Sequence, residues 1–184
     1  MERCAWAESA VEYRAYHDDE WGVPLHGDDA LFERLALEAF QSGLSWITIL
    51  RKRENFRGAF NGFHLATVAA YGDDDVRRLL ADAGIVRNRA KVEATISNAR
   101  VALAQPEGLD RLLWSFADPA AGPQRPATIA DIPATSPASA AMAKELKGRG
   151  FRFIGPTTAY ALMQATGMVD DHVATCWRAA PSGR

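Results

Sequence analysis

The apolar residues of this 184-residue chain recur with the three- and four-residue spacing of α-helices, whereas the alternation of a half-buried β-strand is nearly absent. The clearest helical pattern covers residues 28–40, where Leu, Phe and Ala side chains line one face. Asp28 and Asp29 suit its cap and first turn, where carboxylates meet free N–H groups. The sequence therefore predicts an all-α fold.

Caps, apolar spacing and helix-ending residues predict further helices along the chain. Ser136 and Pro137 give a clear start, because serine caps a helix and proline fits its first turn. The expected helices cover residues 46–60, 73–80, 88–103, 109–116, 136–146 and 156–167, with a last one holding 170–176. Two longer segments, residues 1–27 and the Pro- and Ala-rich stretch 118–133, are expected to be irregular. The whole chain, residues 1–184, is expected to form one domain.

Composition fits a globular domain, since 48% of the residues are hydrophobic. The sequence has neither a secretory signal pattern nor a run of roughly 18 apolar residues, so a cytoplasmic location without a membrane partner is expected. The net charge of −2 does not by itself point to a nucleic-acid binder. For DNA binding, the clustering of cations matters more than their sum.

A turn between two predicted helices, within residues 148–160, has the features of a helix-hairpin-helix element. Its glycines allow a close approach to a phosphate, and free N–H groups at the next helix start point toward it. Lys147, Arg149 and Arg152 surround the turn and would add attraction that is independent of base sequence. Similar turns also join helices that bind nothing, so the segment alone leaves phosphate binding open.

Two cysteines and two histidines form a candidate metal site. Cys4 and Cys176 lie near opposite ends of the chain, and one disulfide is not expected in a reducing compartment. His172 precedes Cys176 by four residues and would share a face of the last predicted helix. With His17 they supply the ligands of a closed, structural zinc site. Spacing alone also fits two buried thiols and two ordinary histidines.

Six stretches of the chain match one known family: MERCAW (1–6), YHDDEWGVP (16–24), QSGLSWIT (41–48), RKREN (51–55), DAGIVR (82–87) and GFRFIG (150–155). Through them the chain resembles the 3-methyladenine DNA glycosylase I family, within the helix-hairpin-helix glycosylase superfamily. The resemblance covers nearly the whole chain, although the tail after Cys176 is not clearly matched. It implies a helix-hairpin-helix glycosylase fold of two helical lobes, with one structural Zn²⁺ at Cys4, His17, His172 and Cys176 joining the two terminal segments.

The same resemblance implies a bacterial base-excision-repair enzyme that acts on alkylated double-stranded DNA. Such an enzyme flips 3-methyladenine out of the duplex and hydrolyses its N-glycosidic bond. It is expected to be a monomer. The implied catalytic residue is Glu38, and the implied base-binding residues are Tyr16, Trp46, Tyr13 and Trp21.

The residue types suit a base that carries a positive charge. A cation over an aromatic ring gains about 0.5–2 kcal/mol beyond burial. Glu38 lies at the edge of an apolar helix face, where a carboxylate must find a partner or become protonated. It could read the amino edge of an adenine, or it could pair with Arg34.

DNA contacts are implied at Gly43 and Leu44, a turn that approaches the gap in the duplex, and at Gly155 and Thr157 in the hairpin. Bifunctional superfamily members carry a nucleophilic lysine at the position of Thr157, so a monofunctional enzyme without lyase activity is predicted. Asp170 either assists the chemistry or caps the last helix; we favour capping.

Two alternatives fit parts of the pattern. A related glycosylase could accept a broader range of alkylpurines, with 3-methylguanine the nearest addition. A non-catalytic, zinc-containing helical module that binds DNA or protein would need the ligands and the hairpin. Such a module would have no use for Tyr16, Glu38 and Trp46 together.

Overall fold

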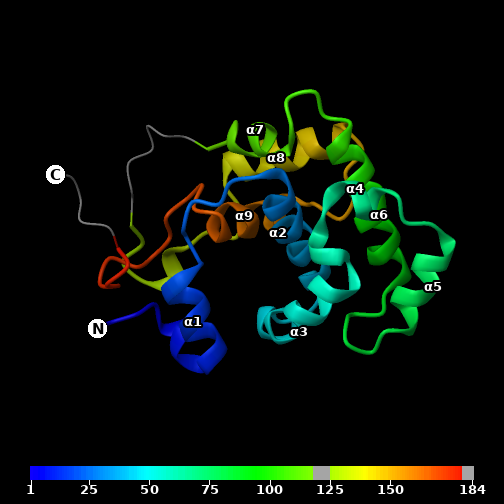
Figure 1. The fold of residues 1–184 in the computed structure, drawn as a ribbon. Coiled ribbons are helices and arrows are strands. Elements are labelled where there is room, and N and C mark those ends of the chain that lie inside the picture. Colours follow the sequence, from blue (N-terminus) through cyan, green and yellow to red (C-terminus); the bar gives the residue numbers. More distant parts are fainter. Residues whose placement is uncertain (118–124, 180–184) are drawn as a thin grey trace.

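The computed structural model describes residues 1–117 and 125–179, and this part of the chain contains helices and no strand. The all-α prediction is therefore confirmed (Figure 1). None of the described helices is long and apolar enough to cross a membrane. In chain order the elements are η1 (Ala5–Ser9), α1 (Val11–Asp19), α2 (Asp28–Gln41), α3 (Trp46–Ala59), η2 (Asn61–Phe63), α4 (Leu65–Ala69), α5 (Asp73–Ala81), α6 (Arg89–Leu103), α7 (Leu109–Trp114), η3 (Ile129–Asp131), α8 (Pro137–Gly148) and α9 (Pro156–Ala165).

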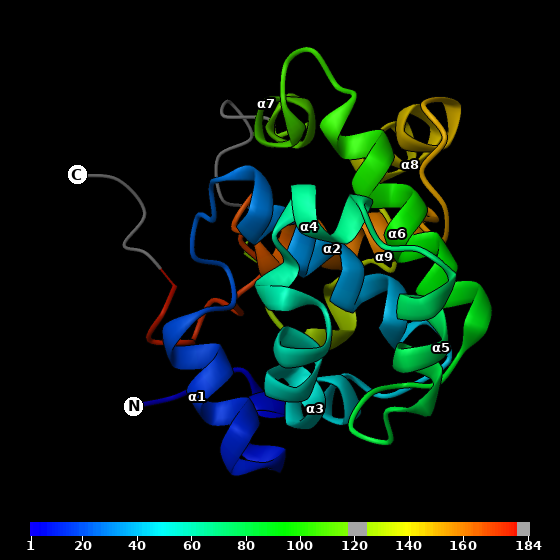
Figure 2. The same cartoon turned by 45° about the vertical axis from the view of Figure 1, so that its right-hand side comes forward.

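Helix α2 lies in the middle of the molecule, with α3, α4, α6, α7 and α9 around it (Figures 1 and 2). All residues from 34 to 40 are buried, because neighbouring helices cover both its apolar face and its flanks. This arrangement takes Glu38 into the interior, although the sequence placed it only at the edge of an apolar face. A carboxylate there loses contact with bulk water and becomes sensitive to its few neighbours.

The start of α2 corrects one detail of the prediction. Neither aspartate provides a side-chain cap, and Gly27 stands at the cap position. Instead, the Asp28 carboxylate accepts a hydrogen bond from the Asp110 N–H at 2.8 Å, and the Asp29 carboxylate accepts one from the Leu65 N–H at 2.8 Å. The two side chains therefore attach the helix start to α7 and α4.

The other predicted helices from α3 to α9 exist, with ends that differ from the prediction by about one or two residues. Ser136 caps α8 as expected, its hydroxyl accepting from the Ser139 N–H at 3.1 Å. The short α4 was missed, because its five residues are too few for a periodic pattern. The predicted loop 118–133 includes η3, and its residues 118–124 lie outside the described part of the chain.

The expectation that residues 1–27 are irregular is wrong, because α1 and the 3-10 helix η1 lie within them. Helix α1 buries only Tyr16 and His17 and has no side-chain cap, so it carries neither a broad apolar stripe nor a start signal. Tertiary contacts outweigh this weak local pattern. The helix packs against η1 and α3.

The predicted last helix is also wrong, since residues 170–176 contain turns but no helix. Helix α9 ends before Gly167, which adopts a φ of +74°. Beyond it, the chain hydrogen-bonds to distant segments: the Ala174 N–H donates to Pro126 O at 3.0 Å and the Trp177 N–H to Glu2 O at 2.9 Å. Figure 2 shows this final segment, in red, beside the blue N-terminal region. His172 and Cys176 therefore do not share a helix face.

The buried apolar side chains form two clusters. The larger surrounds α2, and the smaller joins the N-terminal region to the segment after α9. Trp46 packs against both. The division of residues 1–184 into one domain with two lobes stays a prediction.

Candidate functional site

A cavity of about 420 Å³ opens between α1, α2, α3 and α9. This volume lies in the range of small-molecule sites. All five residues expected to hold or act on a base line this one cavity, although they come from α1, α2, α3 and the segment after α1. The lining residues are Trp6, Tyr13, Tyr16, Trp21, Glu38, Gln41, Trp46, Ile129, Ile132, Ala161, Gln164 and Ala165.

The aromatic rings hold one another in place. Trp6 makes edge contacts with Tyr13 and Trp21, at centroid distances of 5.6 and 5.2 Å, and the Tyr16 and Trp46 rings are 5.5 Å apart. The Tyr13 hydroxyl accepts a hydrogen bond from the Ile47 N–H at 2.9 Å, which attaches the start of α3 to α1. Rings fixed in this way offer a preformed surface for a flat, apolar or cationic group.

Trp46 brings an unpaired donor to this cavity. Its Nε1–H is buried and has no hydrogen-bond partner among the described residues. Such a group loses its water without compensation, unless a ligand supplies an acceptor. The indole therefore offers both an aromatic face and a polar contact.

Glu38 is the only acid that lines the cavity in the described part of the chain. Burial raises the pKa of its carboxyl to about 7, and the positive charge of Arg34 opposes only part of this rise. Its oxygens accept no hydrogen bond from any described residue. A carboxyl that is poised near neutrality and aimed at a cavity is a candidate for ligand recognition or proton transfer.

Glu38 and Arg34 make no direct hydrogen bond or salt bridge, but the positive charge of Arg34 still acts on the Glu38 carboxyl and lowers its pKa against the effect of burial. Instead, Arg34 donates hydrogen bonds to the Tyr16 hydroxyl at 3.0 Å and to Glu20 at 3.2 Å. Arg53 donates to the same Glu20 carboxylate. Burial raises the pKa of Tyr16 well above its usual value, so the phenol stays neutral beside the cavity.

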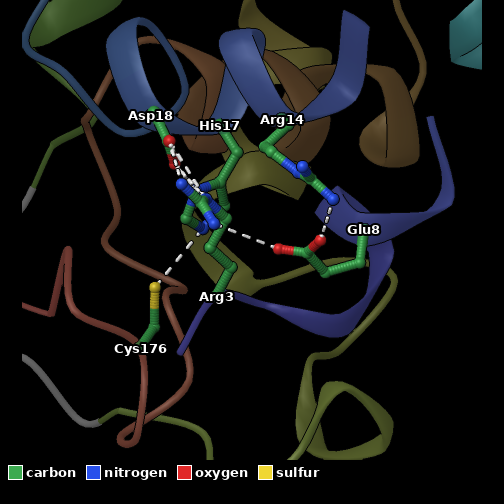
Figure 3. A network of polar contacts seen from close by, with 6 residues as sticks. All are labelled: Arg3, Glu8, Arg14, His17, Asp18 and Cys176. Atoms are coloured by element: carbon green, nitrogen blue, oxygen red, sulfur yellow. Dashed lines mark hydrogen bonds and ion pairs between the residues drawn. The ribbon is translucent and has the colours of Figure 1, made fainter. Parts of the chain in front are cut away.

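The candidate metal ligands also converge. Donor atoms of Cys4, His17 and Cys176 all lie within 4.8 Å of one another, and the three side chains are buried. Figure 3 shows His17 between Cys176 and Asp18: Nε2 is 3.3 Å from the Cys176 sulfur, and Nδ1 is 2.9 Å from the Asp18 carboxylate. Because the carboxylate accepts from Nδ1, the lone pair of Nε2 remains available to an ion. Arg3 in turn holds Asp18, with contacts of 2.7 to 3.0 Å.

His172 lies beside these three residues but outside their 4.8 Å set. Its ring centroid is 5.1 Å from that of His17, and its buried Nε2 has no hydrogen-bond partner in the described chain. Asp170 is not a helix cap, because residues 171–179 contain no helix. Its carboxylate contacts His172 Nδ1 at 2.9 Å and Arg125 at 2.6 Å, and thereby orients the imidazole.

The two candidate DNA contacts are exposed turns. Gly43 adopts a φ of +80° between α2 and α3, and Leu44 is 41% exposed there. Gly155 stands at the cap position of α9, and Thr157 is exposed in its first turn. The buried Asn98 holds this hairpin by pairing with both the N–H and the carbonyl of Arg152, at 2.8 and 3.0 Å.

One cation expected near a phosphate is engaged elsewhere. Arg149 forms ion pairs with Glu107 at 2.6 Å and Glu145 at 2.8 Å, so carboxylates already neutralise it. Lys147 and Arg152 are exposed near the turn. The basic patch is therefore smaller than the sequence indicated.

Sequence reasoning missed several cavity residues. Trp6 and Gln41 lie within the stretches that carry the resemblance, which was an available signal. Gln164 lines the cavity from α9, where its Nε2 donates to Asp171 at 2.7 Å. Ile129 and Ile132 come from the predicted loop, and no local pattern connects them with the other lining residues.

The model of the methyladenine glycosylase family matches residues 6–179, and the chain belongs to that family. The resemblance seen in the sequence is thus confirmed.

Among relatives, the chain is 46% identical over 179 residues to DNA-3-methyladenine glycosylase 1 of Escherichia coli strain K12, covering 96% of each protein. A crystal structure of a 3-methyladenine DNA glycosylase I superposes with a TM-score of 0.90 at 47% identity, covering 96% of this chain and 99% of the other. The enzyme from Staphylococcus aureus, whose structure concerns 3-methyladenine recognition, gives 0.91 at 33% identity and covers 100% and 99%.

Proposed function

We propose that this protein is a monofunctional DNA glycosylase that hydrolyses the N-glycosidic bond of 3-methyladenine in alkylated duplex DNA. One observation carries the proposal: a buried carboxyl that has no hydrogen-bond partner in the described part of the chain faces an aromatic cavity. The relatives named for this activity support the choice of base.

The chemistry follows from the charge of the substrate. An adenine methylated at ring nitrogen 3 is cationic while it is bonded to its sugar, and it leaves readily, so selection of the base is the harder task. The enzyme first extrudes the base from the duplex, at a cost of a few kcal/mol. Tyr16 and Trp46 then offer aromatic faces to the cation. The Trp46 N–H can donate to a ring nitrogen.

Glu38 completes this recognition. Its oxygens can accept from the amino edge of the adenine, and the cationic base favours the ionised carboxylate and so lowers the pKa of that group on binding. An unmodified adenine is neutral and gains neither the cation–π attraction nor the ion pair. The cavity therefore favours the damaged base by charge as well as by shape.

Several features of the site support hydrolysis without strand cleavage. No lysine lines the cavity in the described residues, and Thr157 occupies the hairpin position discussed above. A hydroxyl at that position does not form a Schiff base with the sugar. Gly43, Leu44, Gly155 and Thr157 are proposed to contact the DNA backbone and the gap left by the extruded base.

The metal cluster is proposed to hold one structural Zn²⁺. Two thiols and one imidazole already converge. The buried Nε2 of His172 has no hydrogen-bond partner among the described residues and would serve as the fourth ligand atom. This donor set fits tetrahedral zinc, and four protein ligands leave no open position for chemistry. When bound, the ion would supply a link between Cys4 and His17 on one side and His172 and Cys176 on the other.

The remaining assignments follow from this function. We propose that the chain acts as a monomer in the bacterial cytoplasm. We also propose that it forms one domain with a helix-hairpin-helix element near residues 148–160.

The test is a product assay on methylated duplex DNA. The wild-type protein is expected to release 3-methyladenine, and Glu38→Gln is expected to release it much more slowly. Glu54→Gln, at a side chain that is 78% exposed, serves as the matched control and should behave as wild type. Release of other alkylpurines at comparable rates would favour the broader glycosylase. Release of no base at all would leave the non-catalytic module.

A further inference from the structure

A buried lysine joins α6 to the end of α2. Lys91 is 8% exposed, and its ammonium donates to Phe40 O at 2.8 Å and to Ser42 O at 2.5 Å. The last carbonyl groups of a helix lack partners within the helix and carry partial negative charge. Lys91 satisfies two carbonyls there from a segment about 50 positions away in the sequence.

The segment that Lys91 holds is the turn of residues 42–45. All of its residues are exposed, and Leu44 presents a large apolar side chain that is 41% exposed. The turn begins directly after Gln41 and ends directly before Trp46, and both of these residues line the cavity. It therefore lies at the rim of the base site.

Few other contacts fix this turn. Inside it, the Leu44 N–H donates to Gln41 O at 2.6 Å, and Ser45 contacts Thr48 within α3. Among the described residues, Lys91 is the only side chain from outside α2 and α3 that hydrogen-bonds to positions 40–45. Gly43 adds freedom, because its φ of +80° is accessible to glycine at little cost.

A base in the cavity that is still bonded to its sugar brings the flanking duplex to this rim. The Leu44 side chain must then contact the DNA in a defined position, and a mobile 42–45 turn would lose conformational entropy when the duplex binds. Because Lys91 already restricts the turn before DNA binds, part of this entropy loss does not occur on binding. Burial lowers the pKa of its ammonium, so the position carries an energetic penalty that an exposed lysine would avoid.

We propose that Lys91 is a positioning residue that presets the 42–45 turn for contact with the DNA beside an extruded base. This inference rests on the proposed function and concerns duplex binding, whereas the cavity residues bind the base itself. Lys91 does not line the cavity and takes no part in breaking the bond.

The chain offers a matched control. Lys52 also donates to two backbone carbonyls, Ala83 O and Gly84 O, both at 3.1 Å, but these lie outside the turn. Lys91→Met and Lys52→Met therefore delete the same kind of contact at two places. Lys91→Arg keeps the charge and the donors, and Lys91→Gln keeps one donor group and serves if the Met variant melts below the assay temperature.

Three quantities are measured for each variant: affinity for free 3-methyladenine by tryptophan fluorescence, affinity for a duplex with an abasic site, and single-turnover excision from methylated duplex. For Lys91→Met, losing a charged donor to two carbonyls should weaken duplex affinity and raise the half-saturating protein concentration by about tenfold. The maximal excision rate and free-base affinity should stay within about twofold of wild type, because the cavity is intact. Lys91→Arg should recover most of the duplex affinity, and Lys52→Met should behave as wild type.

A double-mutant cycle with Leu44→Ala independently tests whether Lys91 affects duplex affinity through the 42–45 turn. If Lys91 acts through the turn, Lys91→Met should weaken duplex binding much less in the Leu44→Ala background than in wild type. Full additivity would overturn the inference. So would wild-type duplex affinity in Lys91→Met, an equal loss of free-base affinity, or the same loss in Lys52→Met. If the wild-type protein releases no 3-methyladenine, the proposed function fails, and the abasic-duplex measurements still decide whether Lys91 sets the turn.

Discussion

Replacement of Glu38 by Gln is expected to stabilise the folded protein at alkaline pH. In the folded chain burial raises the pKa of this carboxyl from 4.5 to about 7. Between these two values the folded state binds more protons at this position than the unfolded state does. The free energy of unfolding therefore falls as pH rises through that window, and the loss is complete above the folded-state pKa. Glutamine has nearly the same shape and does not ionise.

The size of the effect follows from the shift. A difference of about 2.5 pKa units at about 1.4 kcal/mol per unit gives an upper estimate of about 3 kcal/mol at pH 8 and less than about 1 kcal/mol at pH 5. For a chain of this length, each kcal/mol moves the melting temperature by about 2–4 °C. Glu38→Gln should then melt roughly 6–12 °C above wild type at pH 8, and only slightly above it at pH 5.

Thermal and urea unfolding of wild type, Glu38→Gln and Glu54→Gln at both pH values would measure this directly. Glu54 is 78% exposed, so its variant should follow wild type at each pH. The reasoning about burial is refuted if Glu38→Gln is no more stable than wild type at pH 8. A gain of equal size at pH 5 and pH 8 would refute it too, because the effect would then not come from ionisation.

Three further outcomes are expected. Elemental analysis should find one zinc per chain, and Cys176→Ser should lose the metal and lower the melting temperature; wild-type protein without stoichiometric metal would contradict the zinc assignment. Asp170→Asn should keep single-turnover excision within severalfold of wild type, since Asp170 orients His172, whereas a hundredfold loss would make it catalytic. Trp46→Phe keeps an aromatic face but removes the unpaired N–H, so free-base affinity measured by calorimetry should fall by about fivefold or more; unchanged affinity would show that this N–H does not contact the base.

The helices that sequence predicted well are those whose local signals agree. Helix α2 combines regular apolar spacing with acidic residues in its first turn, and α8 has both a serine cap and a first-turn proline. Helix α1 lacks such signals and depends on packing. The spacing of His172 and Cys176 suggested a helix, but the tail hydrogen-bonds to the N-terminal segment and to Pro126.

The sequence was enough to predict which residues form the candidate site, but not how charge and hydrogen bonds are arranged around Glu38. Tyr16, Glu38 and Trp46 were found through resemblance to a family, and the fold brings them to one cavity. Helical spacing places Glu38 beside Arg34, yet it does not show that Arg34 turns to Tyr16 and Glu20. Only the folded arrangement reveals that the carboxyl has no hydrogen-bond partner within residues 1–117 and 125–179.

The position of Trp46 against both apolar clusters has a consequence for how the molecule opens. A side chain shared by two packed regions makes the loosening of one region unfavourable for the other. Amide exchange in α1 and α3 should accordingly slow together when a base fills the cavity. Local unfolding of the N-terminal region would then compete with binding of a base in the cavity. A bound base would therefore protect the N-terminal region from proteases, although it contacts only part of that region.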